Sequence, residues 1–495
     1  MSQIYFQYLL GLIRAIYLIC AVILFLYGIN SIILSCIYLK NRKKIWAKNK
    51  DSKLPSEPVV SVQLPIFNEG NLVINLLKHV CQLDYPKDKL QIQVLDDSTD
   101  NTQSLLKDLV LQYQKEGYWI EYYHRKSRVG FKAGNLSFGL KHAKGDFIVI
   151  FDADYEPNPE FIKKTMPLFS EQQVGFVQTR WINRNLDSNI ITNIGGVTYD
   201  GNLFVEQNAR SIGGLFISFS GSAGVWRKEC LQSIGGWQWD TITEDIDASF
   251  RAQIKGWKGI YYPHALSKAE LPDDISAFKI QQNRWAEGSA QNFRKHFGSV
   301  LIAKMPLKVK VMALLHLLSY VTIPAIPISL FLALPLCFLS GEFIKSLWWM
   351  SLGGIGPAIL FTIAQIEQKG KSKKRLLKLP ITLLMAVGIS LDAFAGVVSG
   401  FFHRGGEFIR TPRVGEKTLN IEGDKKVDFI NNLTLAEFIF SIYLLASAYM
   451  LWPTNGKYML PWLLSSAFGL FFWAFLTMFQ ALQQIRKKLL AQEKE

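Results

Sequence analysis

The sequence predicts an α/β domain with a mixed, mainly parallel sheet, inserted between transmembrane helices. Three observations support this fold class. Short β-rich runs alternate with segments of helical length between about residues 59 and 297, a rhythm typical of a parallel sheet covered by helices. An apolar stretch lies near the N-terminus, and long apolar runs follow from Val311 onward. A run of about 20 apolar residues is long enough to cross a bilayer.

Four short apolar runs are expected to form buried strands, at 59–65, 92–95, 147–151 and 175–178. Acidic residues follow two of them directly, after Leu95 and after Phe151. Ligands of open α/β sheets bind at the carboxyl ends of the strands. The acidic residues therefore mark the predicted ligand site.

The first apolar stretch, 15–39, is longer than the core of a signal peptide, and positive charge follows it in place of a cleavage site. It is expected to remain as a membrane anchor. The chain is thus predicted to consist of an N-terminal anchor at 1–45, a cytoplasmic α/β domain at 55–298 and a transmembrane region at 299–485.

Five apolar runs follow the α/β domain, at 311–340, 347–366, 381–402, 433–452 and 460–482. If all five crossed the membrane, the basic loop at 404–426 and the basic tail that begins at Arg486 would both face outward, against the positive-inside rule. A re-entrant or interfacial path for the middle run, which Asp392 interrupts, returns both segments to the cytoplasm.

Charge and cysteine usage exclude two classes of protein. Lys and Arg outnumber Asp and Glu by 55 to 40, a net charge of +15. The basic residues gather beside apolar stretches, as at 41–44 and 371–375, which indicates the cytoplasmic flanks of membrane segments and no nucleic-acid surface. The five cysteines show neither metal-ligand spacing nor a disulfide framework.

Two acidic motifs stand at predicted strand ends. Asp96 and Asp97 begin an Asp-Asp-Ser-Thr-Asp motif, and Asp152 and Asp154 frame an Asp-Ala-Asp motif. The first set can hold the base and ribose of a nucleotide. The second can coordinate a hard cation, Mg²⁺ or Mn²⁺, that neutralises a diphosphate leaving group. Paired acids also occur in solvated turns, so this interpretation depends on the motifs that follow.

Lys132 lies among small residues in a Gly-Phe-Lys-Ala-Gly-Asn segment, where its ammonium could offset phosphate charge, although an ordinary surface loop would read the same. Glu244 and Asp245 form a Thr-Glu-Asp motif. A carboxylate there could take the proton from an acceptor hydroxyl, the general-base role that an inverting sugar transfer requires.

A Gln-Gln-Asn-Arg-Trp segment supplies Gln281, Arg284 and Trp285. An arginine suits a phosphate oxygen, and an indole suits stacking on a sugar ring. The same segment could instead be an amphipathic helix on the membrane. Trp226 and Trp181 carry a similar ambiguity between acceptor contact and core; Trp226 is taken here as an acceptor contact.

Together, the Asp-Asp-Ser-Thr-Asp, Asp-Ala-Asp, Thr-Glu-Asp and Gln-x-x-Arg-Trp motifs resemble the signature of the processive family-2 glycosyltransferases, which include cellulose, hyaluronan and mannan synthases. The resemblance covers about residues 59–297. The segments at 65–69, 178–181 and 219–224 are most similar to those of the cellulose-synthase-like mannan and glucan synthases.

The resemblance implies a GT-A fold with four groups of site residues. The donor is expected to contact Asp96, Asp97, Lys132, Asp152 and Arg284. The metal, Mg²⁺ or Mn²⁺, is expected on Asp152 and Asp154, and the catalytic base is expected to be Asp245. The acceptor is expected to contact Glu244, Gln281, Trp285 and Trp226.

A segment at 403–432 resembles the gating loop by which this family covers bound nucleotide. It offers Arg410 and Arg413 as further donor contacts. Closure of such a loop would exclude water and favour transfer to sugar over hydrolysis.

The expected function is an inverting, metal-dependent transfer of hexose from a UDP- or GDP-hexose to a growing β-glycan, a glucan, mannan or glucomannan, with translocation through the membrane segments. The alternative is a glycolipid synthase that glycosylates diacylglycerol, ceramide or a polyprenyl phosphate. A third interpretation is a transport or scaffold protein with a disabled transferase domain. The expected location is a bacterial plasma membrane, with the Golgi membrane as the alternative, and the catalytic domain in the cytoplasm.

Overall fold

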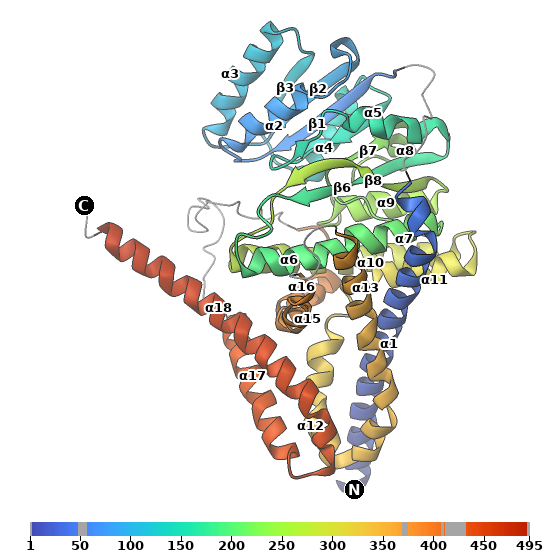
Figure 1. Ribbon diagram of the computed structural model, residues 1–495, viewed down its shortest axis with the longest axis vertical. Helices are drawn as coiled ribbons and strands as arrows, with labels where there is room; N and C mark the ends of the chain where they lie inside the picture. The colour runs from blue at the N-terminus through green and yellow to red at the C-terminus, as the bar shows by residue number, and fades with distance from the viewer. Residues whose placement is uncertain (1, 48–56, 369–374, 407–409, 411–431, 493–495) are drawn as a thin grey trace.

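The computed structural model describes residues 2–47, 57–368, 375–406, 410 and 432–492. An eight-stranded sheet lies above a group of long helices (Figure 1). Its strand order is β3-β2-β1-β4-β7-β6-β8-β5. The strands are β1 Val60–Ile66, β2 Leu90–Asp96, β3 Ile120–His124, β4 Phe147–Ile150, β5 Glu156–Pro157, β6 Val174–Asn183, β7 Gly224–Arg227 and β8 Lys258–Ala269.

The sheet is mixed and mainly parallel, as predicted. Strands β3, β2, β1 and β4 pair in parallel, and so do β6 and β8. Strand β7 is antiparallel to both of its neighbours, and β5 is antiparallel to β8. The four strands expected from the sequence are β1, β2, β4 and β6. The short strand β7 and the alternating β8 escaped that analysis because neither is a continuous apolar run.

Helices cover both faces of the sheet, so the strands are buried on both sides. Alternate residues of one strand enter different cores: Val149 belongs to the core beneath the helices α2, α3 and α5, whereas Ile148 and Ile150 belong to the core beneath α4, α8 and α9. The helices are α2 Leu72–Cys81, α3 Thr102–Lys115, α4 Phe131–His142, α5 Phe161–Thr165, α8 Lys228–Ser233 and α9 Glu244–Ile254.

A second layer of helices lies between the sheet and the long apolar helices (Figure 1). It is formed by α6 Ile190–Asp200, the π-helical η3 Gly201–Glu206, α7 Gln207–Ile212, α10 Ile275–Ile302 and α11 Leu307–Leu317. The short 3-10 helices are η1 Lys87–Lys89, η2 Met166–Ser170, η4 Trp348–Gly354 and η5 Asn455–Met459.

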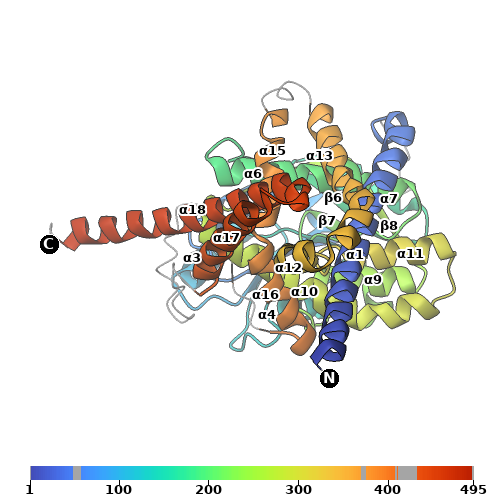
Figure 2. The ribbon, with the colours of Figure 1, turned by 90° about the horizontal axis from the view of Figure 1, so that it is seen from below.

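Within the described residues, five helical segments are long and apolar enough to cross a membrane: 3–45, 325–346, 348–367, 432–451 and 455–483. They correspond to α1 Ser2–Ile45, α12 Ala325–Ser346, η4 with α13 Ile355–Glu367, α17 Asn432–Leu451, and η5 with α18 Leu460–Gln492. The C-terminal part of α18 projects away from the other helices (Figures 1 and 2).

The apolar run at 311–340 does not form one helix. Helix α11 ends at Leu317, a turn occupies 318–324, and α12 begins at Ala325. Pro324 explains the break, because a proline disfavours helical geometry in the residue before it. The expectation of a single span over 311–340 is therefore corrected to a span that begins at 325.

The run at 381–402 is also broken, but the break lies at Ile389, and Asp392, which the sequence analysis took as the interruption, lies inside the second helix. It forms α15 Leu379–Gly388 and α16 Ser390–Phe402, which are bent by 45° as in a broken span or a re-entrant loop. Helix α16 packs closely on α10. A Cβ on Gly396 would lie 2.5 Å from the Asn283 carbonyl oxygen, and one on Gly400 would lie 2.3 Å from that of Glu287. The re-entrant path across a membrane stays a prediction.

A buried ionic cluster joins α10 to the apolar helices. The Lys279 Nζ lies 2.7 and 2.8 Å from the Glu437 carboxylate oxygens on α17 and 3.6 Å from Asp392 Oδ2 on α16. All three residues are buried, with Glu437 completely inaccessible. Since one lysine faces two acids, the cluster depends on that single cation for its charge balance.

Replacing the lysine of this cluster should destabilise the protein strongly. Lys279→Met leaves two buried carboxylates without their cation, and loss of one partner from a buried ion pair costs about 3–5 kcal/mol. The matched control is Lys308→Met, an exposed lysine on α11, which should change stability by less than about 0.5 kcal/mol. The measurement is the free energy of unfolding in mild detergent. Equal losses in the two variants would contradict the role given to the cluster.

Candidate active site

The acidic motifs meet where strands β2 and β4 end. Asp96 is the last residue of β2 and Asp97 follows it, while Asp152 follows β4. Because β1 pairs in parallel with both strands, the carboxyl ends of β2 and β4 lie on the same edge of the sheet. Lys132 on α4 and Glu244 on α9 reach this edge from the helices.

Asp96 and Asp97 both have partners within the protein. Asp96 is completely buried, and its carboxylate accepts hydrogen bonds from the Ser98 backbone at 2.8 Å and from the Tyr122 hydroxyl at 2.7 Å. Asp97 accepts two hydrogen bonds from Arg125, at 2.7 and 2.5 Å. Burial raises the pKa of Asp97, and Arg125 opposes that rise. The hydrogen bonds of Asp96 suit this residue to hold the edge of the sheet in place. Contact of Asp96 or Asp97 with the donor stays a prediction.

Lys132 is the point where the two halves of the site meet. Helix α4 begins at Phe131, after Gly130 in the left-handed region at φ 73°. This turn directs Lys132 Nζ to Asp152 Oδ1 at 2.6 Å and to the Gly221 carbonyl at 3.1 Å. Glu244 Oε1 lies 4.0 Å away. Burial disfavours the ammonium, but Asp152 and Glu244 outweigh it and raise the pKa of Lys132.

Glu244 and Asp245 form the first turn of α9. Helix N-termini stabilise negative charge, and Asp245 Oδ1 accepts a hydrogen bond from the Ile246 backbone at 2.8 Å. Burial nevertheless raises the pKa of both carboxyls, that of Glu244 to about 7 with a further contribution from Asp245, while Lys132 opposes the rise. Two adjacent carboxyls that resist ionising together suit proton transfer near neutral pH.

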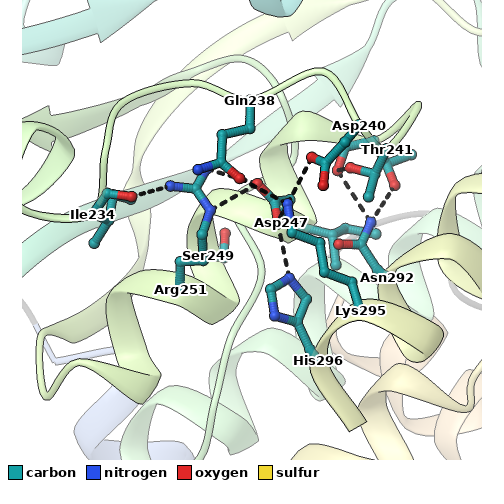
Figure 3. Close-up of polar contacts among 12 residues, drawn as sticks. Ile234, Gln238, Asp240, Thr241, Asp247, Ser249, Arg251, Asn292, Lys295 and His296 are labelled. Atoms are coloured by element: carbon teal, nitrogen blue, oxygen red, sulfur yellow. Dashed lines mark hydrogen bonds and ion pairs between the residues drawn. The ribbon is translucent and has the colours of Figure 1, made fainter. Parts of the chain in front are cut away.

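A polar network holds α9 in place on α10 (Figure 3). Its centre is Asp247, which is completely buried and lies 2.6 Å from Arg251, 2.7 Å from Lys295 and 2.9 Å from His296. Burial works against ionisation, yet His296 and Arg251 hold the pKa of Asp247 well below its usual range. The network therefore fixes the helix that carries Asp245.

Helix α10 also forms hydrogen bonds with the segment that leads into α9. The Asn292 side chain donates to the Thr243 Oγ1 at 2.8 Å, and Gln291 accepts from the Ile242 backbone at 2.8 Å (Figure 3 shows the Asn292 contacts). A Cβ on Gly288 would lie 2.4 Å from the Thr243 Oγ1, so glycine allows this close approach. These contacts fix the position of Glu244 and Asp245 relative to the sheet.

Four aromatic residues, Tyr155, Trp181, Tyr199 and Trp285, form a row beside the acidic motifs. Neighbouring rings contact edge to face, with centroids 6.1, 6.4 and 5.6 Å apart along the row. The Tyr199 hydroxyl donates to Gln281 at 2.8 Å, which brings the row to the Gln-x-x-Arg-Trp motif. Amphipathic rings of this kind suit sugar binding, so we call these four residues the aromatic row.

Arg284 lies near both Tyr199 of the aromatic row and Asp245. Its positive charge lowers the pKa of Asp245 and that of Tyr199, although burial raises both. Arg284 therefore lies close enough to both residues to act on either charge. Gln281, Arg284 and Trp285 are thus brought to the site, as the sequence predicts.

Trp226 is a correction to the predicted acceptor set. It is completely buried, stacks on Phe176 at 4.5 Å and contacts Phe219 and Trp237 edge to face. It lies on β7, whose two faces are both covered by helices, so a side chain on either face enters a core. The prediction that Trp226 contacts an acceptor is wrong.

The segment after α16 contacts residues on two sides of the site. The Gly405 backbone donates to the Asp240 carbonyl at 2.7 Å, and its own carbonyl accepts from Gln291 at 2.7 Å. Arg410 Nη1 lies 3.1 Å from Glu69 Oε2, just beyond β1. Arg413 and most of the predicted gating segment lie outside the described residues.

The chemistry of the carboxylates at the β4 end fits a divalent cation. Asp152 and Asp154 lie two residues apart, and Asp154 is 5% exposed. Within the described ranges, no group of three or more His, Cys, Asp or Glu side chains is arranged to hold a metal ion. A pair of carboxylates is nonetheless enough for Mg²⁺ or Mn²⁺ when phosphate oxygens of a substrate complete the shell. Asp152 would then exchange part of its contact with Lys132 for the metal.

Several residues that build the site carry no motif signal. Arg125, Tyr199 and Asp247 act through contacts between elements far apart in the sequence, so no local pattern marks them. Glu69 stands in the segment at 65–69 that already resembled the synthases, and its pairing with Arg410 gives it a role. Arg410 was expected to lie over the donor. A search for an acidic residue that could pair with Arg410 is the signal that could have identified Glu69.

Comparisons with known proteins give a matching family model and a related protein of similar sequence. Residues 147–352 match the family model for glycosyl transferase family group 2. Glucomannan 4-beta-mannosyltransferase 1 of Oryza sativa subsp. japonica is 39% identical over 246 residues, 48% of this chain and 47% of the rice protein. The match therefore spans about half the length of that relative.

A solved structure shows the same fold. The mannosyltransferase PcManGT from Pyrobaculum calidifontis, in complex with GDP-Man and Mn²⁺, has a TM-score of 0.54 and 20% sequence identity. The similarity covers 79% of this chain and 99% of that chain. The predicted GT-A fold class is confirmed.

A methyl group at position 221 should impair transfer more than it impairs folding. Gly221 has φ 78°, and a Cβ there would lie 3.2 Å from Asp245 Oδ2 and 3.4 Å from Lys132 Nζ. Gly221→Ala should displace these groups and lower hexose transfer by roughly a hundredfold.

Gly214→Ala is the matched control. It has φ 64° with no atom within 4 Å of the added Cβ, so it carries the same backbone strain, about 1–2 kcal/mol, without touching the site. Transfer assays and melting temperatures are measured on both. Equal transfer by the two variants would contradict the placement of Gly221 between the base and Lys132.

Proposed function

Because residues 147–352 match the family model for glycosyl transferase family group 2, we propose that the protein transfers a hexose from a nucleotide-diphosphate sugar to a growing β-linked glycan. One observation carries the proposal. A single ammonium, that of Lys132, lies 2.6 Å from Asp152 and 4.0 Å from Glu244, with Asp245 beside it. The phosphate-binding and proton-accepting groups therefore share one site.

The transfer proceeds by a single displacement with inversion. Asp245 takes the proton of the acceptor hydroxyl as that oxygen attacks the anomeric carbon and the bond to the diphosphate breaks. Lys132 and Arg284 bind the diphosphate and offset the charge that develops on it. The aromatic row, with Gln281, holds the terminal sugar of the acceptor so that its hydroxyl faces Asp245.

A divalent cation belongs to this mechanism. Asp152 and Asp154 would hold Mg²⁺ or Mn²⁺, which stabilises the negative charge of the leaving diphosphate. The mannosyltransferase of similar fold was solved with Mn²⁺, and that supports the assignment. Asp97, fixed by Arg125, contacts the nucleoside at the end of β2, and Arg410 contacts the donor from the segment beyond α16.

The names of the relatives support one substrate class. The rice relative is named as a glucomannan mannosyltransferase and the archaeal structure holds GDP-Man. Mannose from GDP-mannose is accordingly the first donor to test, and a mannan or glucomannan is the proposed product. The resemblance to processive synthases, together with the several apolar helices after the catalytic domain, supports repeated addition and passage of the glycan across the bilayer.

The catalytic domain is proposed to face the cytoplasm. Arg42, Lys43 and Lys44 stand at the end of α1 that joins the catalytic domain. Basic residues at a helix end favour the cytoplasmic side. GDP-mannose and UDP-sugars would then reach the site from the compartment where they are made.

A glycolipid synthase is the second candidate. The apolar helices could hold a lipid acceptor in place of a glycan, and the aromatic row ends close to them at Trp285. Product partition separates the two functions, because a lipid product enters the organic phase and a long glycan stays in water.

The proposed function is tested with the protein in lipid vesicles, labelled GDP-mannose, UDP-glucose, UDP-N-acetylglucosamine and UDP-galactose, and Mg²⁺ or Mn²⁺. We expect one donor, GDP-mannose, to give water-soluble label of high molecular weight. Asp245→Asn removes the base and should lower transfer by about 10²- to 10⁴-fold. Asp108→Asn, an exposed aspartate on α3, is the control and should leave transfer unchanged.

Each outcome of the donor test has a separate meaning. Label confined to the organic phase would replace the polysaccharide synthase with the glycolipid synthase. Full transfer by Asp245→Asn would remove that residue from the role of base. Transfer that survives complete removal of divalent metal would contradict the role proposed for Asp152 and Asp154.

Transfer should also depend on pH through the carboxyl pair. Burial and Asp245 raise the pKa of Glu244 to about 7, so a proton stays on the pair below that pH and the base is not available. Activity should therefore rise as pH increases through about 7. Glu244→Gln removes one negative charge beside Asp245, which lowers the pKa of the remaining carboxyl and should move the rise to lower pH.

The pH profile of kcat/KM checks this expectation, with Asp108→Asn again as the control. A profile that Glu244→Gln leaves in place would contradict the coupling between the two carboxyls.

A further inference from the structure

A cavity outside the active site opens where the catalytic domain meets two apolar helices. Its volume is about 930 Å³, and it is walled by the C-terminal ends of α1 and α13, by the end of β6, and by residues of α6 and η3. The motifs of the proposed function do not line it. Its only member in common with the aromatic row is Trp181.

The cavity has more positive than negative charge. Four cationic and two acidic residues line it. Arg42 pairs with Glu367 at 2.8 Å, and Arg375 lies 3.3 Å from Asp200, so both acids are already engaged. Among the described residues, the other two cations, Lys43 and Arg180, form no ion pair. The cavity therefore presents two positive charges to an anion.

Arg180 is held in a fixed orientation. Its guanidinium lies over the rings of Phe204 and Trp46, at 4.5 and 5.6 Å from their centroids. Its Nε is buried without a hydrogen-bond partner in the described structure, as is Asn183 Oδ1 beside it. Buried polar atoms normally have partners. A planar guanidinium that is already oriented, and that forms no ion pair within the described residues, suits a phosphate oxygen.

The apolar part of the wall distinguishes a lipid from a soluble anion. Leu39 of α1 and the rings of Trp46 and Phe204 line the same cavity as the cations. Leu39 is 50% exposed and lies one turn before the basic end of α1. In a membrane-spanning helix, the basic end stands at the level of the lipid phosphates. An amphiphilic lipid can contact both the cationic and the apolar residues of the wall, whereas free phosphate can contact only the cationic ones.

We propose that this cavity binds the phosphate headgroup of an anionic membrane lipid, with Arg180 and Lys43 on the phosphate and the first part of an acyl chain against Leu39. The proposal rests on the membrane placement of α1 and α13 and is independent of sugar transfer. Because Trp181 belongs both to this wall and to the aromatic row, the bound lipid would also contact one member of that row.

Lipid retention tests the proposal. The full chain is placed in phosphatidylcholine vesicles with or without phosphatidic acid and is then extracted into detergent. Native mass spectrometry measures the lipid that stays bound to the intact protein. We expect phosphatidic acid to be retained. Arg180→Gln and Lys43→Gln each remove one charge-assisted contact and should lower retention roughly tenfold. Lys44→Gln, the neighbouring lysine that does not line the cavity, is the matched control and should retain the lipid.

The outcomes are distinct. Equal retention of phosphatidic acid by all three variants, or equal retention of phosphatidylcholine, would overturn the proposal. Displacement of the lipid by inorganic phosphate at similar concentration would assign the cavity to a soluble anion. Lys43 is exposed, so Lys43→Gln keeps the test valid if Arg180→Gln does not fold. Asp245→Asn should lose transfer and keep the lipid, so failure of the proposed function and failure of this proposal can be told apart.

Discussion

The site depends on one partly buried ammonium, that of Lys132. Without Lys132, the carboxylates of Asp152, Glu244 and Asp245 would face one another in a space that excludes most water, where like charges repel strongly. The lysine also joins parts that the chain supplies separately, since it comes from α4, Asp152 from the end of β4 and the other two from α9.

Helix α10 connects this chemistry to the apolar helices. Its His296 and Asn292 hold the segment and helix that carry the proposed base, and its Gln281 meets the aromatic row. The same helix packs on α16 through the glycines of that helix and is tied to α17 by Lys279. Trp285 of the aromatic row and the segment that carries the proposed base thus share α10 as a support, and α10 is anchored outside the sheet.

The sequence predicted the residues whose role is local. Asp97, Asp152 and Lys132 stand at strand ends or in glycine-rich turns, and such positions can be read from short patterns. Trp226 was wrongly assigned to the acceptor because its burial depends on which elements cover β7. Arg125 and Tyr199 act on partners 28 and 82 residues away, and only the folded chain brings them together. The break before α12 was readable from Pro324, but the apolar composition on both sides concealed it.

The close packing of α16 on α10 has a consequence for the independence of the catalytic domain. Ala286 and Ala290 of α10 are completely buried, and they pack against Ala393 and Val397 of α16. A soluble fragment cut near residue 298 would expose this face together with Lys279, whose charge partners would be missing. The domain that contains the candidate site is therefore not independent of the apolar helices, because part of its packing surface is completed by residues that come about 100 positions later in the chain.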